Sequence, residues 1–238
     1  MTTRIVLPTY CRPEKLARLL RSMDAGMTPN TEVHIGWSPG DPTRREGDRL
    51  LVGRPWLRYF THEPAFHAAE FWNAYLARVQ ADIYVYLCDD TELMRDTLVT
   101  ARLLYLANFP HFDGLLGFDQ INLRAAGVDT CPAAFGAIGR KFIDAFPGRR
   151  VFCPDYHTLW VDQEMMEYAQ ARGKFVFAPE VRLYHHHPSV NSQDLDVTHT
   201  HNRQFKRADN ATRATRRSRG LTWGLSWELV NAEKGASA

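Results

Sequence analysis

The chain has 238 residues, of which 45% are hydrophobic, and a formal net charge of +2 at neutral pH. This size and composition exclude a small disulfide-rich scaffold and predict one large core in an α/β domain with an appendage. We expect no signal peptide at residues 1–7 and no transmembrane segment, because no apolar run is long enough. Four cysteines without CxxC spacing indicate reduced thiols, and we expect a soluble, cytoplasmic protein.

Strands and helices alternate in the first third of the sequence. Short apolar segments and apolar residues at helical spacing predict, in chain order, strand 4–7, helix 14–23, strand 31–37, strand 56–61 and helix 65–80. The segment 41–54 is charged and contains glycine and proline, which predicts an exposed loop. The alternation predicts βαβ units, and therefore a mostly parallel sheet flanked by helices.

The stretch 82–93 joins a buried strand to two carboxylates. Residues 83–87 are β-branched, aromatic or aliphatic, which predicts a strand buried on both faces. Asp89 and Asp90 follow at its carboxyl end, where open α/β sheets bind ligands. Such neighbours repel each other unless a positive group lies between them and a ligand, and a divalent cation carrying a diphosphate is the usual such group. The alternative is that both residues begin a turn and cap a helix starting near Arg95.

Further elements follow the acidic pair. In chain order we predict helix 95–108, strand 114–118, a segment of small residues with a short helix at 133–146, an amphipathic helix at 160–172, and β-segments at 174–178 and 181–184. Asp162 lies in or beside the first turn of the amphipathic helix, where a capping role competes with a chemical one. Three histidines end the last segment. In an extended chain His185 and His187 face one side, so two at most converge on one ion, and solvated surface histidines are the alternative.

The C-terminal extension, residues 191–238, is basic and follows a domain that we expect to span residues 1–190. Seven lysines or arginines lie between Arg203 and Arg219, and Trp223 and Trp227 follow. A basic helix of this kind could contact a phosphate backbone or an anionic membrane surface. The alternative is a solvated basic helix that packs through a few apolar residues.

Six short segments of the sequence are each a weak indicator of a family, but their order along the chain is informative. They are Ile-Val-Leu-Pro-Thr-Tyr-Cys-Arg-Pro at 5–13, Asn73, Leu-Cys-Asp-Asp-Thr at 87–91, Phe-Gly-Ala-Ile-Gly-Arg at 135–140, Val-Asp-Gln-Glu at 161–164 and Tyr-His-His-His at 184–187. In this order and at this spacing they resemble the GT-A fold glycosyltransferases of the family-two type. The resemblance covers about residues 4–190 and implies a GT-A fold, a nucleotide-sugar donor and a divalent cation, Mg²⁺ or Mn²⁺.

The resemblance also implies a donor site and a metal site. The implied donor-binding residues are Pro8, Thr9, Tyr10, Arg12, Asp41, Asn73 and Asp89. The segment Cys88-Asp89-Asp90 corresponds to the family's Asp-X-Asp, so Asp90 would be the metal ligand and Cys88 departs from the pattern. Asp89 could then take over the ribose contact of the missing carboxylate. His185 matches the family's metal-side histidine, with His187 on the same face.

Asp162 matches the general base of inverting members of the family, and Glu164 is the competing candidate. Phe135, Gly136 and Ala137 would form part of the acceptor wall. The sequence leaves the acceptor open between a small-molecule, glycan or protein hydroxyl and a hydroxylated base in DNA, which would have to be flipped out. A different class is a catalytically silent subunit that binds nucleotide sugars, and the presence of Asp90, Asp162 and His185 together argues against it.

Overall fold

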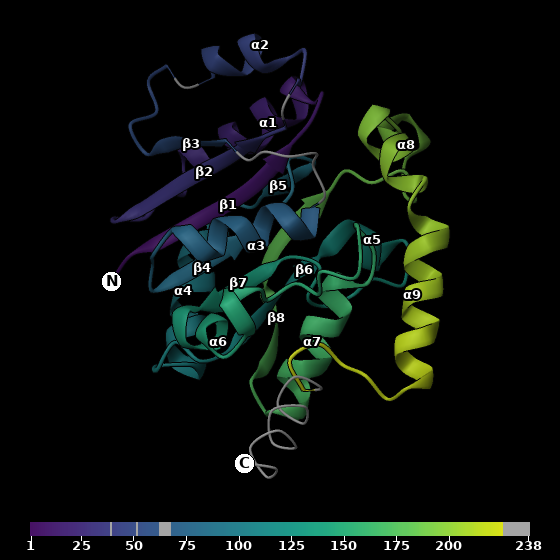
Figure 1. The fold of residues 1–238 in the computed structure, drawn as a ribbon. Coiled ribbons are helices and arrows are strands. Elements are labelled where there is room, and N and C mark those ends of the chain that lie inside the picture. The colour runs from purple at the N-terminus through teal and green to yellow at the C-terminus, as the bar shows by residue number, and fades with distance from the viewer. Residues whose placement is uncertain (39, 51, 62–67, 226–238) are drawn as a thin grey trace.

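A mixed sheet of eight strands forms the centre of the computed structural model, which describes residues 1–38, 40–50, 52–61 and 68–225 (Figure 1). The strand order is β3-β2-β1-β4-β7-β6-β8-β5. The strands are β1 Thr3–Thr9, β2 Thr31–Trp37, β3 Leu57–Thr61, β4 Ile83–Tyr86, β5 Thr91–Leu93, β6 Leu115–Gln120, β7 Gly136–Gly139 and β8 Phe175–His185. The expected α/β class is confirmed.

The two halves of the sheet differ in strand direction. Strands β3, β2, β1 and β4 are parallel, as the alternation of strands and helices predicts. Strand β7 is antiparallel to both β4 and β6, and β5 is antiparallel to β8, whereas β6 and β8 are parallel. The sheet is therefore mixed and departs from the expected parallel arrangement at β7 and β5, because β7 enters between β4 and β6 in the opposite direction and β5 pairs antiparallel with β8.

The helices are α1 Pro13–Asp24, α2 Arg44–Arg49, α3 Ala68–Arg78, α4 Thr97–Asn108, α5 Ile121–Ala125, α6 Arg140–Asp144, α7 Val161–Ala171, α8 Val197–Arg203 and α9 Lys206–Ser218, with 3₁₀ turns at Pro147–Arg149 and Ser192–Asp194. One expectation needs correction and one is confirmed for the described residues. The segment expected as an exposed loop at 41–54 contains α2, and its Asp41 is buried. The expected helix 65–80 is observed as α3, and residues 65–67 lie outside the described residues.

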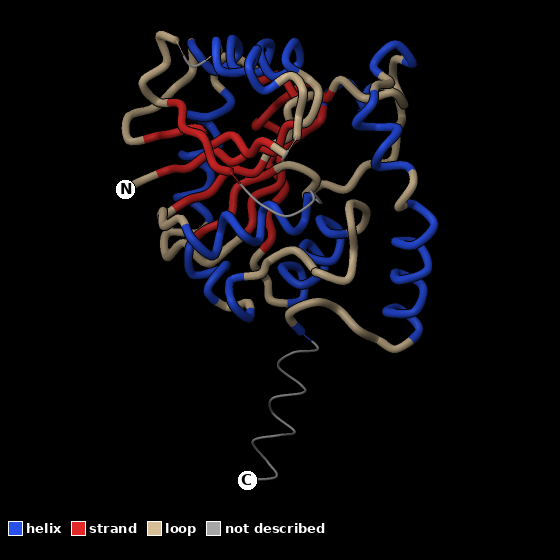
Figure 2. Tube along the Cα trace, turned by 45° about the horizontal axis from the view of Figure 1, so that its top comes forward, coloured by secondary structure: helices blue, strands red, loops and turns tan. Residues whose placement is uncertain are grey.

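Strand β4 separates two hydrophobic cores, one on each face of the sheet. Ile83 and Val85 pack into the core that α1 and α4 cover, whereas Tyr84 and Tyr86 pack into the core under α3, α6 and α7. Figure 2 shows helices on both sides of the strands. Every residue of β4 is buried, as an apolar run without alternation predicts. The carboxyl end of this central strand is consequently held firmly from both sides.

The acidic pair that follows β4 lies in a turn but caps no helix. The backbone N–H of Thr91 donates to the carbonyl oxygen of Cys88 at 3.2 Å and closes the turn. Strand β5 comes next, and α4 begins only at Thr97, with Asp96 at its N-cap position. The capping alternative is therefore wrong, and the carboxylates of Asp89 and Asp90 are available for other partners.

Helix α9 is fastened to α7 by buried ion pairs. The carboxylate of Glu164 is fully buried and accepts hydrogen bonds from Nε and Nη2 of Arg216 at 2.8 and 3.1 Å. Arg213 also contacts Glu164 and donates to Glu167. Of the basic residues that could contact a polyanion, Arg213 and Arg216 are thus buried against carboxylates.

Two further expectations concern the extension and the membrane. Trp223, which follows the basic segment, donates its indole N–H to the carbonyl oxygen of Arg150 at 2.6 Å. Trp227 lies outside the described residues. Among the helices that the structure describes, none is both long and apolar enough to span a membrane.

We predict that Arg216→Met lowers the free energy of unfolding by about 3–5 kcal/mol, because it leaves the Glu164 carboxylate buried without its main partner. Arg217→Met is the matched control, since the Arg217 side chain is 69% exposed, and we expect a loss below about 1 kcal/mol. Denaturant unfolding of both variants measures the difference. Equal losses would show that the buried pair does not attach α9 to α7.

Candidate functional site

A cavity of about 580 Å³ opens at the carboxyl ends of the central strands. Its wall is formed by residues after β4 and β8, by the turn before β7, by the start of α7 and by helices α8 and α9. This volume is typical of a small-ligand site. Asp90, Asp162, His185 and His187, four of the residues singled out from the sequence, line the same cavity.

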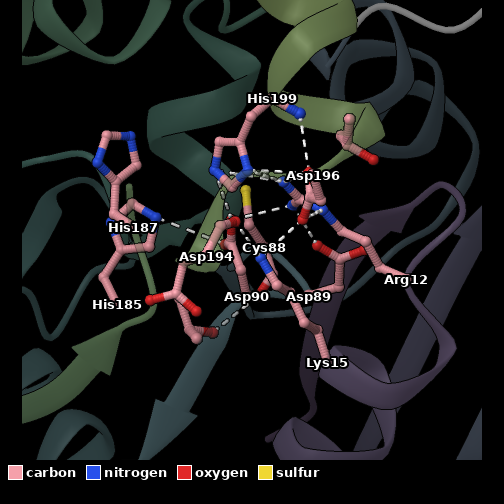
Figure 3. Close-up of polar contacts among 12 residues, drawn as sticks. Arg12, Lys15, Cys88, Asp89, Asp90, His185, His187, Asp194, Asp196 and His199 are labelled. Atoms are coloured by element: carbon pink, nitrogen blue, oxygen red, sulfur yellow. Dashed lines mark hydrogen bonds and ion pairs between the residues drawn. The ribbon is translucent and has the colours of Figure 1, made fainter. Parts of the chain in front are cut away.

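The guanidinium of Arg12 lies between the two adjacent carboxylates (Figure 3). Its Nη1 donates to Oδ1 of Asp89 at 2.8 Å and to Oδ2 of Asp90 at 2.9 Å. Thr9 donates its hydroxyl to the second oxygen of Asp89 at 2.7 Å. All four side chains are buried, so the positive group that the sequence required beside the carboxylates is supplied by the protein itself.

Strand pairing brings His185 to Asp90 from nearly a hundred residues away. Thr91 of β5 pairs with His185 of β8, and the backbone N–H of His186 donates to the carbonyl oxygen of Asp90 at 2.8 Å. Nε2 of His185 consequently lies 3.5 Å from Oδ1 of Asp90. Nδ1 of His185 lies 2.8 Å from Oε1 of Gln120, and this contact fixes the plane of the ring.

The environments of the carboxylates push their pKa values apart. Burial opposes ionisation of Asp90, but the nearby His185, Arg12 and His199 outweigh burial and hold its pKa well below its usual range. Burial raises the pKa of Asp89, although Arg12 counteracts it. Asp90 is therefore the carboxylate of the pair that stays ionised most readily.

The three consecutive histidines alternate as an extended chain requires. His185 and His187 both line the cavity, and their ring centroids are 5.0 Å apart. His186 faces away and its Nε2 lies 3.0 Å from a carboxylate oxygen of Glu92. Burial and the charges of His185 and His199 lower the pKa of His187 to about 4, so this imidazole is neutral at neutral pH.

Asp162 lies at the start of α7 and lines the cavity. Its Oδ1 accepts the backbone N–H of Gln163 at 2.9 Å. Desolvation raises the pKa of Asp162, and the hydrogen bond from Gln163 only partly opposes this shift. A carboxylate that is harder to ionise than usual is a better proton acceptor, which suits a general base.

Glu164 is two residues further along the same helix but occupies a different environment. It is fully buried in the ion pairs with α9 and is not among the described residues that line the cavity. Its carboxylate oxygens also accept hydrogen bonds from the Tyr156 hydroxyl and the Trp223 backbone. Glu164 therefore links α7 to α9, and its role as the competing candidate for the base stays a prediction.

Of the implied donor-binding residues, the described structure places only Arg12 on the cavity wall. Asp41 is buried and accepts the backbone N–H of Cys11 at 2.9 Å, which holds the first loop. The side chain of Asn73 donates to the backbone carbonyl oxygen of Phe152 and accepts the backbone N–H of the same residue. Phe152 itself lines the cavity. Tyr10 accepts the hydroxyl of Thr198 at its carbonyl oxygen. The contacts of Pro8, Thr9, Tyr10, Asp41, Asn73 and Asp89 with a donor stay predictions.

The expected acceptor wall is observed in part. Phe135 lines the cavity, and its ring packs edge-on against His185 with centroids 4.9 Å apart. Gly136 and Ala137 lie inside β7 and are not among the described residues of the wall. A Cβ atom on Gly136 would lie 2.4 Å from the carbonyl oxygen of Leu116. The close packing of the neighbouring strands therefore explains why this position is a glycine.

Helix α8, from the extension, closes one side of the cavity. Asp196 is its N-cap and accepts both Nε and Nη2 of Arg12 at 2.9 Å, and Lys15 donates to the same carboxylate at 2.7 Å. Nε2 of His199 lies 3.5 Å from Oδ2 of Asp90. Figure 3 shows Asp196 and His199 converging on Arg12 and Asp90.

The sequence interpretation missed several residues of the wall, among them Trp72, Phe152, Trp160, His199, Arg203 and Lys206. The sequence did contain one signal for α8: Asp196 is a typical N-cap residue, and its side chain accepts the backbone N–H of His199, three residues later. A helix start at Asp196 could therefore have been predicted. Its contact with Arg12 could not, since that contact spans 184 residues.

The residues near Asp90 fit a divalent cation in part. Oδ1 of Asp90 is buried without a hydrogen-bond partner among the described residues, and it faces Nε2 of His185. A carboxylate oxygen and an imidazole nitrogen are suitable ligands for Mn²⁺. The described residues contain no group of three or more His, Cys, Asp or Glu side chains arranged for a metal. A cation here would consequently take its remaining ligands from water or a bound substrate.

Comparison with solved structures identifies the fold. The chain is similar to the mannosyltransferase PcManGT of Pyrobaculum calidifontis, solved with GDP-Man and Mn²⁺, with a TM-score of 0.61 and 17% identity over 76% of this chain and 56% of that one. TarS of S. aureus gives a TM-score of 0.59 with 15% identity over 78% of this chain and 36% of TarS. A TarS structure in complex with UDP-GlcNAc gives 0.58 with 15% identity over 74% of this chain and 55% of that one.

These similarities show that the chain has the GT-A glycosyltransferase fold. The matched region spans about half or less of the length of those structures. Neither a protein-family model nor a curated protein matches the sequence.

We predict that Asp196→Ala makes the backbone amides of α8 exchange with solvent about 10–100-fold faster, because hydrogen bonds to charged groups contribute about 1.5–3 kcal/mol each. Hydrogen exchange followed by mass spectrometry measures this. Asp194→Ala is the control, since Lys15 contacts only the backbone carbonyl of Asp194. Equal exchange in the two variants would mean that Asp196 does not hold α8 over the cavity.

Proposed function

We propose that this chain is an inverting glycosyltransferase that transfers a sugar from a nucleoside-diphosphate donor to an acceptor hydroxyl. One observation carries the proposal: Asp90, His185 and Asp162 line a single cavity at the carboxyl ends of the strands of a GT-A fold. The first two suit a divalent cation that would hold the charged diphosphate, and the third suits the acceptor hydroxyl. Solved proteins of similar fold hold GDP-Man or UDP-GlcNAc, which supports a nucleotide-sugar donor.

Direct displacement assigns one role to each group. The acceptor oxygen forms a bond to the anomeric carbon while the bond from that carbon to the diphosphate oxygen breaks. The acceptor proton moves to the carboxylate of Asp162, and the electron pair of the broken bond leaves with the diphosphate. Asp162 is the base in this proposal because it lines the cavity, whereas Glu164 is held away from it by Arg213 and Arg216.

The departing diphosphate needs positive charge close to the carboxyl end of β4. Arg12 is held there as a cation, because the charges of Asp89 and Asp90 raise its pKa although burial alone would lower it. Asp90 and His185 would hold a divalent cation, as the Mn²⁺ in the mannosyltransferase structure supports. When bound, such a cation stabilises the negative charge on the leaving diphosphate.

DNA is a weaker candidate for the acceptor. The alternative that a modified DNA base is glycosylated relied on the seven cations from Arg203 to Arg219. Arg213 and Arg216 are occupied by Glu164 and its neighbours, so fewer cations remain to contact phosphates. A catalytically silent subunit would bind a donor but turn none over, and the experiments below distinguish it.

We predict that turnover needs a divalent cation and that Asp90→Asn removes this dependence together with at least about 10²-fold of the activity. A panel of nucleotide sugars is assayed for transfer and slow hydrolysis, with EDTA and then with added Mn²⁺ or Mg²⁺. Asp113→Asn, which alters a carboxylate paired with Lys174 away from the cavity, is the control and should behave as wild type. Full activity of Asp90→Asn in chelator would contradict the metal assignment.

We predict that Asp162→Asn lowers transfer by about 10²-fold or more, because the amide cannot accept the acceptor proton. The substitution is nearly isosteric, so the fold and the Kd for the nucleoside diphosphate should stay close to wild type. Activity is measured as kcat with saturating donor, and binding by calorimetry. Normal transfer by Asp162→Asn would show that another group is the base.

A further inference from the structure

Trp160 has a backbone conformation that is unusual for a bulky residue. Its φ is 70° and its ψ is −5°, in the left-handed region that normally favours glycine. The residue lies immediately before α7 and two positions before Asp162, lines the cavity and remains 38% exposed. Strained backbone of this kind persists where the surroundings enforce it, and such positions cluster at functional sites.

Helix α9 fixes the indole ring of Trp160 on two sides. The indole N–H donates to Oδ1 of Asn210 at 2.9 Å. The guanidinium carbon of Arg213 lies 5.6 Å from the ring centroid, and Arg213 is itself held by Glu164 and Glu167. A half-exposed tryptophan with a fixed ring plane loses little conformational freedom when a ligand packs against it.

The loop that carries Trp160 is also held by α9. The carboxylate of Asp209 is fully buried and accepts the backbone N–H groups of His157, Thr158 and Leu159 at 2.9, 2.9 and 2.8 Å. Leu159 and Thr158 line the cavity beside Trp160. The extension therefore builds a wall of the cavity that leads directly to the proposed base.

We propose that Trp160 is the platform on which a sugar ring of the acceptor stacks, so that the acceptor is a saccharide. This inference rests on the proposed function. The C–H face of a pyranose ring is apolar and its hydroxyls are polar, and a fixed indole beside a carboxylate offers a surface for each. A saccharide acceptor stacked on Trp160 would place its hydroxyls near Asp162, since both residues line the same cavity and Asp162 follows Trp160 by two positions at the start of α7.

A flipped nucleobase could also stack on an indole, but it needs phosphate contacts beside the cavity. Of the basic side chains around Trp160 and the cavity, Arg213 packs on the indole and is buried against carboxylates, which leaves Arg203 and Lys206 on the described part of the cavity wall. Two cations are few for a phosphate backbone, so the geometry favours the saccharide, and an oligonucleotide containing 5-hydroxymethylcytosine serves as a competing acceptor in the test.

The test compares wild type, Trp160→Ala and Trp160→Phe with the donor that the hydrolysis panel identifies. The acceptors are a panel of methyl pyranosides, with glycerol as an acceptor that has hydroxyls but no ring. We expect Trp160→Ala to raise KM for the pyranoside that wild type uses by about tenfold or more, with kcat within about twofold. Trp160→Phe should retain most of the affinity, and transfer to glycerol and slow donor hydrolysis should be unchanged.

Two further variants separate ring positioning from general effects. Asn210→Ala removes the hydrogen bond to the indole from an exposed position, and we expect KM to rise about threefold with kcat unchanged. Phe177→Ala is the matched control, because Phe177 is an equally exposed aromatic residue that lines a different hollow. It should behave as wild type.

Three outcomes would overturn the proposal that Trp160 stacks against the acceptor. They are a wild type that prefers no pyranoside over glycerol, a preference for the oligonucleotide, and a Trp160→Ala variant that loses affinity for the donor instead of the acceptor. Each of them still requires donor turnover. A wild type that neither hydrolyses nor transfers from any nucleotide sugar would instead contradict the proposed function.

Discussion

The buried guanidinium of Arg12 is the interaction on which the site depends. It lies within hydrogen-bond distance of three carboxylates, those of Asp89, Asp90 and Asp196. Two adjacent carboxylates in a buried turn would repel each other and shift toward the protonated form without such a partner. Arg12 therefore acts with His185 and His199 to keep Asp90 ionised, and its planar fork joins the three carboxylates in a way that a lysine could not reproduce.

The same residue makes the C-terminal extension part of the site. Arg12 attaches α8 through Asp196, and a second buried network attaches α9 through Glu164. Removing one partner of a buried pair leaves the other charge unpaired in a medium of low dielectric constant, so each network is stable only when complete. Helix α8 and the first residue of α9 consequently contribute to the cavity wall, and the rest of α9 packs against α7.

Periodicity and local chemistry allowed part of this protein to be predicted from its sequence. The apolar run after residue 82 required a strand buried on both faces, and this placed Asp89 and Asp90 at a carboxyl end of the sheet. The twofold alternation of an extended chain put His185 and His187 on one side. Helical spacing placed Asp162 in a first turn. Each of these inferences depends only on residues close together in the chain.

By itself the sequence thus determined the α/β class, the edge of the sheet that carries the site and the residue types available there. Only the tertiary structure decided which partners meet. It put Arg12 against Asp196, 184 residues away. It also separated Asp162, on the cavity wall, from Glu164, buried under α9. Local pattern sets which face of an element a side chain occupies, whereas the partner on that face depends on packing between distant segments and on the requirement that buried charges be paired.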